Sequence, residues 1–279
     1  MMTMKSTHPW KFLIGAALVA VATPTRADLA RDANTTRIVG EEGNWVMENA
    51  LQLEKDNDGK TWAVETAVQY APSDRVQLLL EPTLWERDEP KDGSTESGVG
   101  DTDFTIAYLV LPDEGLWPAV IVAGKVKIPT ADNREIGTGK ADYSASLIIG
   151  KEFGELDVSL ELEYETFGDP PSEPVAMDPA GEPLDPDEMA VDSATAEEVE
   201  LKDQFIYTLS IDYGLTENLG VFVEIFGNSE PTKDEDSSNA VGVGLEYDIE
   251  LTDYANPFIE VGVDTDDLVS AKVGVEWNW

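Results

Sequence analysis

A period-two alternation of apolar and polar residues, repeated along most of the chain, constrains its fold more than any other feature. In 156–166 (LDVSLELEYET), Leu, Val and Tyr alternate with Asp, Ser and Glu. Segments 204–214 and 268–279 alternate in the same way. Because successive side chains of a strand point to opposite faces, each such segment predicts a β-strand with one apolar and one polar face.

About twelve such segments follow one another, with turn residues between them, and roughly nine to eleven residues suffice for a tilted strand to cross a membrane. Tyr and Trp stand near the ends of the apolar faces, as in the interfacial girdles of outer-membrane barrels. We therefore expect an all-β fold, a single antiparallel transmembrane β-barrel over 28–279. A secreted, soluble acidic β-protein is the alternative, because a sandwich also alternates. The expected strands are 45–55, 61–71, 75–85, 103–111, 118–128, 140–150, 156–166, 204–213, 218–227, 239–249, 254–263 and 268–279.

The connections between these segments alternate in length. Those after every second segment are tight, whereas most of the others are longer and polar, and the longest, about 167–203, is dense in Asp, Glu and Pro. Outer-membrane barrels have short periplasmic turns and longer extracellular loops. The sequence therefore predicts short turns on the periplasmic side and long acidic loops outside. The tight connections are 72–74, 112–117, 151–155, 214–218 and 250–253.

The N-terminal segment is typical of a secretory signal. Lys5 and Lys11 flank the start of an apolar run, 12–22, that is too short to span a bilayer as a helix, and 25–27 fits a small-x-small cleavage site. We expect a signal peptide at 1–27 to be cleaved and the rest to reach the outer membrane of a Gram-negative bacterium. Trp277 and Trp279 in the last segment are expected to be outward-facing girdle residues and an assembly signal for the barrel-assembly machinery.

Charge and composition exclude several functions. The chain has 18 Lys and Arg against 57 Asp and Glu, a net charge of −39, which repels nucleic acid. It has no Cys, and its one His lies at position 8, inside the expected signal peptide. A mature chain without His or Cys cannot use Ser-His-Asp or Cys nucleophiles, or bind zinc or haem through His. We therefore expect no enzyme activity, no cofactor and no catalytic residues.

If the apolar faces meet lipid, the polar faces line the lumen. Phe222, Phe226, Leu109 and Leu111 would also point inward in this register. A barrel of about twelve strands is near the size at which a narrow pore becomes possible, so both a conducting and a filled lumen remain open. An excess of carboxylates predicts a preference for cations or neutral solutes. The expected lumen-lining residues are Glu65, Gln69, Lys125, Lys127, Asp157, Glu161, Glu163, Asp212, Glu224, Glu246, Asp248, Glu260, Lys272 and Glu276.

Two acidic loop segments have the composition of weak cation sites. Residues 56–59 (DNDG) match part of a calcium-binding loop but lack its distal Glu, and they are better interpreted as a hairpin turn in which Gly59 supplies a positive φ. Residues 264–267 (DTDD) also predict a turn. We expect at most weak binding of divalent cations at these loops and assign no metal ligands.

Three motifs at the expected loop–strand junctions resemble those of a known family. They are GVGDT at 98–102, KIPTAD at 127–132 and GTG at 137–139. In this order they resemble the outer-membrane β-barrel transporters of the meta-pathway phenol-degradation family, although the acidic insert at 167–203 departs from that pattern. The resemblance implies uptake of aromatic or other hydrophobic compounds and identifies no substrate contact. Locally, the glycines permit tight turns and Pro129 ends a strand, so a structural role for the motifs is favoured.

These observations support a functional hypothesis with one main competitor. The first is a channel or transporter in the outer membrane that passes small solutes, including aromatic, hydrophobic or cationic ones. The second is a non-conducting barrel whose acidic loops act at the cell surface. In both cases the expected partners are outer-membrane lipid and the assembly machinery.

Overall fold

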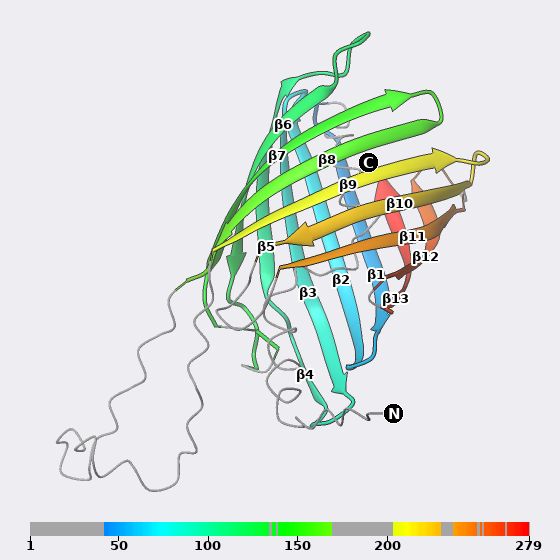
Figure 1. Ribbon diagram of the computed structural model, residues 1–279. Helices are drawn as coiled ribbons and strands as arrows, with labels where there is room; N and C mark the ends of the chain where they lie inside the picture. The colour runs from blue at the N-terminus through cyan, green and yellow to red at the C-terminus, as the bar shows by residue number, and fades with distance from the viewer. Residues whose placement is uncertain are drawn as a thin grey trace, which may run out of the picture.

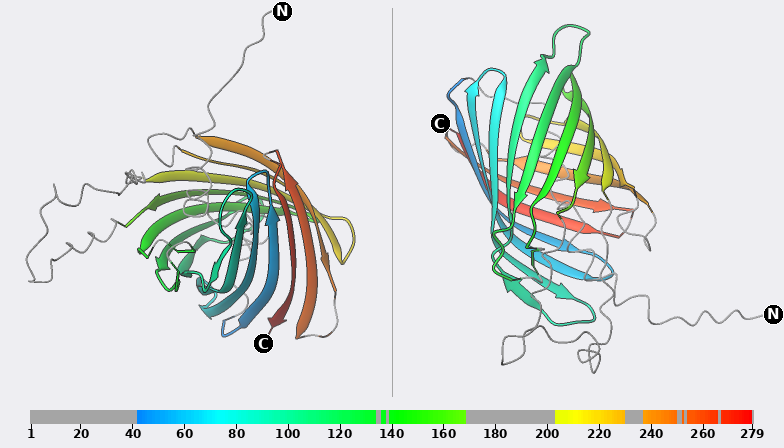
Figure 2. Two further views of the ribbon diagram at one scale, coloured as in Figure 1. Left: turned by 90° about the horizontal axis from the view of Figure 1, so that it is seen from below. Right: turned by 90° about the vertical axis from the view of Figure 1, so that its left-hand side faces the viewer.

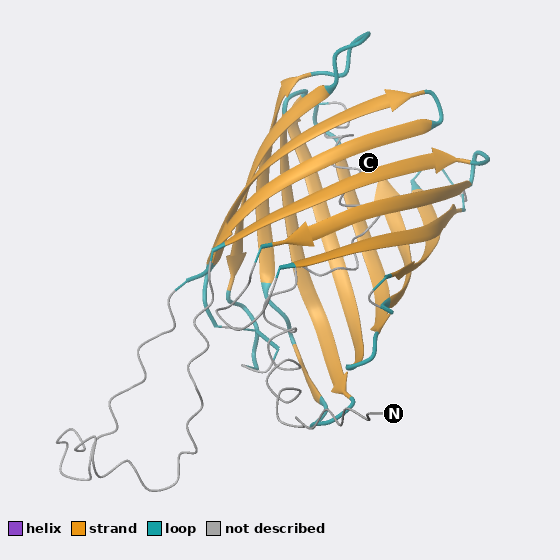
Figure 3. Cartoon of the chain, in the orientation of Figure 1, coloured by secondary structure: helices purple, strands orange, loops and turns teal. Residues whose placement is uncertain are grey.

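The computed structural model describes residues 42–133, 136–137, 139–168, 203–229, 237–249, 252, 254–265 and 267–278. The regular structure of these residues consists of strands joined by turns and loops (Figure 3). Twelve strands have ten or more residues, and β4 is a short addition between β3 and β5. In chain order they are β1 (Trp45–Lys55), β2 (Gly59–Ser73), β3 (Val76–Pro90), β4 (Glu96–Gly98), β5 (Thr102–Leu111), β6 (Ala119–Ile128), β7 (Asp142–Phe153), β8 (Leu156–Thr166), β9 (Gln204–Gly214), β10 (Leu219–Asn228), β11 (Ser238–Asp248), β12 (Ala255–Asp264) and β13 (Val269–Asn278).

The twelve long strands form one closed antiparallel barrel (Figures 1 and 2). Each long strand pairs with the next long strand of the chain, and β13 pairs with β1, which closes the ring. A closed barrel satisfies every backbone donor and acceptor in the membrane-spanning zone without a free edge. The barrel predicted from the alternating segments is therefore confirmed.

The outer face of the barrel is an exposed apolar belt. On β12 the outward side chains are Ile259, Val261 and Val263, which are 47%, 44% and 48% exposed. Their neighbours Phe258 and Glu260 point inward and are 0% and 2% exposed. An apolar belt that surrounds the molecule has far more area than the apolar patches of soluble proteins, and it fits a bilayer.

Aromatic side chains border this belt at both ends. At the end with the short turns, Trp45 and Tyr70 stack with ring centroids 4.3 Å apart, and Trp277 faces outward from β13. At the opposite end, Tyr143 and Phe205 are 57% and 48% exposed. The two girdles mark the levels at which the barrel would meet the lipid headgroups.

At the long-loop end, β2 begins two residues before the predicted 61 and β3 ends five residues after the predicted 85, beyond Trp85. Charged side chains of this extension bind one another: Glu89 lies 2.6 Å from Lys60 and 2.9 Å from Arg87. The expected ends at 61 and 85 are wrong for this hairpin, because both of its faces are polar outside the membrane and it has no apolar period to detect. β4, which pairs with the extension of β3, was not predicted for the same reason.

Two local expectations are wrong. A register shift between Leu109 and Leu111 places Leu111 opposite Val120, so Leu111 is 48% exposed instead of facing inward. The turn before β2 forms without a positive φ at Gly59, because Asp56 Oδ1 accepts hydrogen bonds from two following backbone N–H groups at 2.8 and 2.9 Å. Gly59 is needed for space instead: a Cβ there would lie 2.7 Å from the Glu89 carbonyl oxygen.

The connections observed between the strands follow the predicted alternation. Two residues, Asp74 and Arg75, join β2 to β3, and two more, Gly154 and Glu155, join β7 to β8. No helix among the described residues has the length and hydropathy needed to cross a membrane. The expected signal peptide at 1–27, nearly all of the acidic loop at 167–203 and Trp279 lie outside the described residues.

Candidate functional site: the barrel lumen

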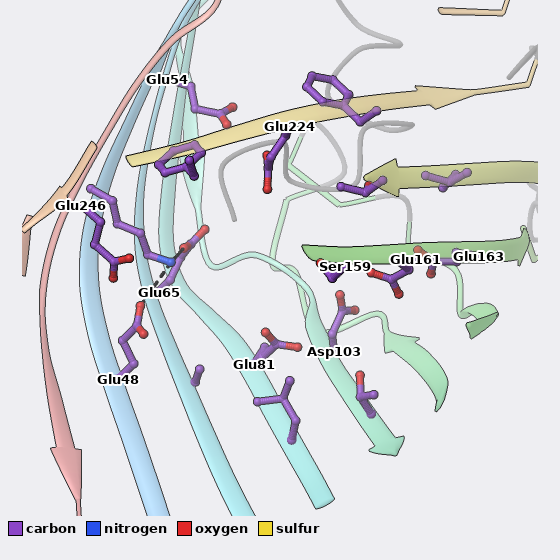
Figure 4. A pocket seen from close by; sticks show the side chains of 18 of the residues that line it. Glu48, Glu54, Glu65, Glu81, Asp103, Ser159, Glu161, Glu163, Glu224 and Glu246 are labelled. Atoms are coloured by element: carbon purple, nitrogen blue, oxygen red, sulfur yellow. Dashed lines mark ion pairs between the residues drawn. The ribbon is translucent and has the colours of Figure 1, made fainter. Parts of the chain in front are cut away.

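A cavity of about 1080 Å³ lies inside the barrel and is lined by residues of all twelve long strands. It includes Thr216 and Asn218 at the short-turn end, and Asp56 and Leu268 at the long-loop end. The interior is therefore hollow between the two ends of the barrel. The close-up in Figure 4 shows Glu and Asp side chains pointing into this space from opposite walls.

Strand alternation carries most of the predicted lumen residues into this cavity. Glu260 differs: it is 2% exposed and lies in the wall between its strand partners Glu246 and Lys272. The expected lumen residues that line the cavity are Glu65, Gln69, Lys125, Lys127, Asp157, Glu161, Glu163, Asp212, Glu224, Glu246, Asp248, Lys272 and Glu276. Phe222 and Phe226 also line it, as predicted from the register.

The charge of the lining is strongly acidic. Of the described residues that line the cavity, 23 are Asp or Glu and five are Lys. Carboxylates at close quarters stabilise cations in a pore and repel anions. The electrostatic potential of the lumen therefore favours positive charge.

Inward-facing lysines pair with carboxylates of neighbouring strands. Lys272, which is 6% exposed, has its Nζ 3.2 Å from Glu48 Oε1 and 3.8 Å from Glu65 Oε2, so it links β13, β1 and β2. Lys125 Nζ lies 3.3 Å from Glu163 Oε1, across β7. Lys127 pairs with Asp142, its direct strand partner on β7. These pairs offset part of the cost of holding so many carboxylates in the barrel interior.

Another part of the wall is held by neutral and charged hydrogen bonds. Ser210 Oγ donates to Glu224 Oε1 at 3.0 Å, and both side chains are 0% exposed. Asn228 Nδ2 donates to Gln204 Oε1 at 3.4 Å. These contacts join β9 to β10 on the inner face and fix polar side chains against the wall rather than across the lumen.

Two phenylalanines lie flat against the wall because glycines leave room for them. The place of a Cβ on Gly244 is 2.2 Å from Phe222 Cζ, and the place of a Cβ on Gly274 is 2.5 Å from Phe258 Cζ. Phe222 and Phe258 are 2% and 0% exposed. Two bulky rings are thereby packed into the positions of missing side chains, which keeps them out of the open part of the lumen.

The lining is not polar throughout. Ala107, Ile121 and Ile148 on β5, β6 and β7 form a buried cluster on the inner face, with Leu109 and Ala123 packed against it. Ala107 and Ile148 also line the cavity. The lumen therefore presents an apolar patch on one wall among acidic surroundings.

Several cavity residues were absent from the prediction. Glu48, Glu54, Glu81 and Asp103 face the cavity from β1, β3 and β5, and the same period-two rule could have identified them. Ile136, which lines the cavity from the β6–β7 loop, has no such signal in the sequence. Residues contributed by loops depend on how the loops pack, and that is a tertiary property.

Ionisation at the two ends of the barrel is shifted by local contacts. Beyond Trp85, burial raises the pKa of Asp88, although a hydrogen bond from Thr61 Oγ1 at 3.2 Å acts in the opposite direction. In the turn between β5 and β6, the hydrogen bond from Lys151 holds the pKa of Asp113 below its ordinary value. The described residues include no group of three or more Asp, Glu, His or Cys side chains placed to hold a metal ion.

The fold and the hollow acidic lumen define a bacterial outer-membrane β-barrel. The sequence profile of the family described as "Putative MetA-pathway of phenol degradation" matches residues 27–254, and the chain belongs to this family. No match was found among curated protein sequences.

Three solved structures resemble the barrel at low sequence identity. An outer-membrane channel from Pseudomonas putida F1 has 13% identity and a TM-score of 0.60, over 86% of this chain and 97% of that one. The NanC porin has 8% identity and a TM-score of 0.52, over 83% and 98%. The translocator domain of autotransporter NalP from Neisseria meningitidis has 10% identity and a TM-score of 0.52, over 89% and 92%. At these identities the likeness establishes the fold.

Proposed function

We propose that this protein is an outer-membrane channel that passes small solutes and prefers cations and neutral molecules to anions. The observation that carries the proposal is the cavity of about 1080 Å³, which is lined by all twelve long strands and by residues at both ends of the barrel. The ratio of 23 carboxylates to five lysines among its described lining residues supports the cation preference.

The solute class that fits best is small and aromatic or otherwise hydrophobic. Two observations support it: the family description names phenol degradation, and the apolar patch around Ile121 and Ile148 gives the lumen an apolar wall. An aromatic solute could move along this wall while its polar group stays hydrated on the acidic side. The lumen-lining residues named above are the proposed solute contacts.

The proposal assigns no catalysis to the barrel. The similar structures are named as a channel, a porin and a translocator domain. We also propose that the chain is exported by a signal peptide that is cleaved after residue 27, and that Trp277 and Trp279 serve recognition by the barrel-assembly machinery. Outer-membrane lipid is then the surrounding partner, with divalent cations bound weakly at the acidic loops.

Electrical recording from the purified full chain in planar bilayers tests the proposal. Under a KCl gradient, the sign of the reversal potential should indicate selectivity for K⁺ over Cl⁻, and liposomes carrying the protein should swell in neutral sugars and take up phenol. Selectivity for Cl⁻ would contradict the electrostatic argument. If neither ions nor neutral solutes pass, the non-conducting surface barrel is the better explanation.

A further inference from the structure

Two loops at the outer end of the barrel lock onto each other. Asp132 Oδ1 accepts a hydrogen bond from the backbone N–H of Val99 at 2.8 Å, and Asp101 Oδ1 accepts one from the N–H of Ala131 at 3.0 Å. Thr130 Oγ1 adds a hydrogen bond to the Gly100 carbonyl at 3.2 Å. We call residues 98–101 and 130–133 together the loop brace. Each of its two Asp carboxylates accepts a hydrogen bond from a backbone N–H group of the opposite loop.

Three glycines allow the brace to close. A Cβ on Gly98 would lie 2.3 Å from Asp132 Oδ1, and a Cβ on Gly100 would lie 2.7 Å from Thr83 Cβ. A Cβ on Gly137 would lie 2.4 Å from Ala131 Cβ and 2.9 Å from both Asp101 carboxylate oxygens. None of the three requires a positive φ, so each is explained by close approach rather than by backbone conformation.

The brace directs the β6–β7 loop into the mouth of the lumen. The backbone N–H groups of Ile136 and Gly137 both donate to the carbonyl of Asn133, which belongs to the brace, at 3.1 and 3.0 Å. Ile136 is 8% exposed, and both residues line the cavity. Around them the same cavity is lined by acidic side chains, including Glu86 and Asp103. An apolar side chain is therefore held among acidic side chains at the mouth of the pore.

We propose that the loop brace holds Ile136 as the fixed constriction of the outer mouth and that this side chain determines which solutes enter. Its butyl group narrows the opening and offers an apolar contact to an entering aromatic solute. The acidic residues around it favour cations and reject anions. This inference rests on the proposed channel function, which it extends to a specific residue and a specific end of the barrel.

Cysteine substitution tests the constriction directly, because the chain contains no Cys. Ile136→Cys in the full-length barrel would be treated with a small cationic methanethiosulfonate reagent during bilayer recording. Leu268→Cys is the matched control, since Leu268 lines the same cavity at the same end and is 6% exposed. Modification at 136 should remove roughly half or more of the K⁺ current, because conduction is limited at the narrowest point, and modification at 268 should remove much less.

A second variant tests the size of the Ile136 side chain without chemical modification. Ile136→Ala should raise the conductance roughly 1.5-fold or more if this side chain limits the pore. Ile259→Ala, the same change on the outward face of β12, where the side chain is 47% exposed and does not line the cavity, should leave it close to wild type. Asp132→Ala should weaken the brace and increase current fluctuations. Heat-modifiable migration on a gel would verify that each variant is folded.

The possible outcomes separate the two proposals. A wild-type barrel that conducts nothing contradicts the channel function, and the constriction with it. A wild-type barrel that conducts normally, with equal effects of modification at 136 and 268 and equal effects of the two alanine changes, contradicts only the constriction.

Discussion

Replacement of Gly244 by alanine tests whether the absence of a Cβ at this position lets the Phe222 ring lie out of the lumen. Gly244 faces inward on β11, directly opposite Phe222 on β10. An added Cβ would lie 2.2 Å from Phe222 Cζ and 2.5 Å from the Val261 backbone oxygen. The ring is 2% exposed and the oxygen belongs to the barrel wall, so the ring must move toward the lumen. Overpacking of this kind lowers the free energy of unfolding by about 1–3 kcal/mol.

The same substitution at Gly124 provides the matched control. Gly124 faces outward on β6, and the nearest atom to an added Cβ is the Ser144 carbonyl oxygen at 3.9 Å. With no clash, alanine should raise the free energy of unfolding by about 0.5–1 kcal/mol, because glycine in a strand interior carries an entropic cost. The two Gly→Ala changes are therefore expected to differ in sign.

Urea unfolding of the barrel in lipid vesicles, followed by tryptophan fluorescence, measures both changes. Phe222→Leu in the Gly244→Ala background should restore only part of the loss, because the contact with the Val261 oxygen remains. A Gly244→Ala variant as stable as Gly124→Ala would refute the argument that Phe222 fills the place of a side chain. Bilayer recording of Gly244→Ala should also give a lower conductance than wild type.

Two further predictions concern ion pairs at different depths. Lys272→Met should lower the free energy of unfolding by up to about 3 kcal/mol, which is the low end of the range for breaking a buried ion pair. The low end applies because Glu48 and Glu65 keep some contact with water. Loss of the lysine charge should also shift the reversal potential toward stronger cation selectivity. In the β5–β6 turn, Asp113 stabilises the fold above its unfolded pKa of 3.8 and loses this contribution as pH falls through its lower folded pKa, so backbone amide exchange in 112–118 should accelerate only in strong acid. Asp113→Asn should show the faster exchange already at pH 7, and equal exchange in the variant and wild type would contradict a role for Lys151 in holding the turn.

The acidic lumen could be predicted because it follows from a local rule. The alternation in β8 and β9 assigns Glu161, Glu163 and Asp212 to one face, and closure of the barrel makes that face internal. The closure itself follows from the apolar opposite face, which needs lipid, and from the need to pair every strand edge. The predicted side-chain directions are wrong where the period-two alternation is interrupted, as at the register shift before Leu111.

The sequence by itself determined the barrel, its approximate strand number and the sign of its interior charge, because a period-two pattern can be identified from consecutive residues without any distant contact. Only the tertiary structure decided that Phe222 lies against Gly244, since the strand register brings them together. Only it decided that the GVGDT and KIPTAD motifs brace each other and hold Ile136 in the mouth. Loop packing depends on contacts between residues about thirty positions apart, and no local periodicity encodes them.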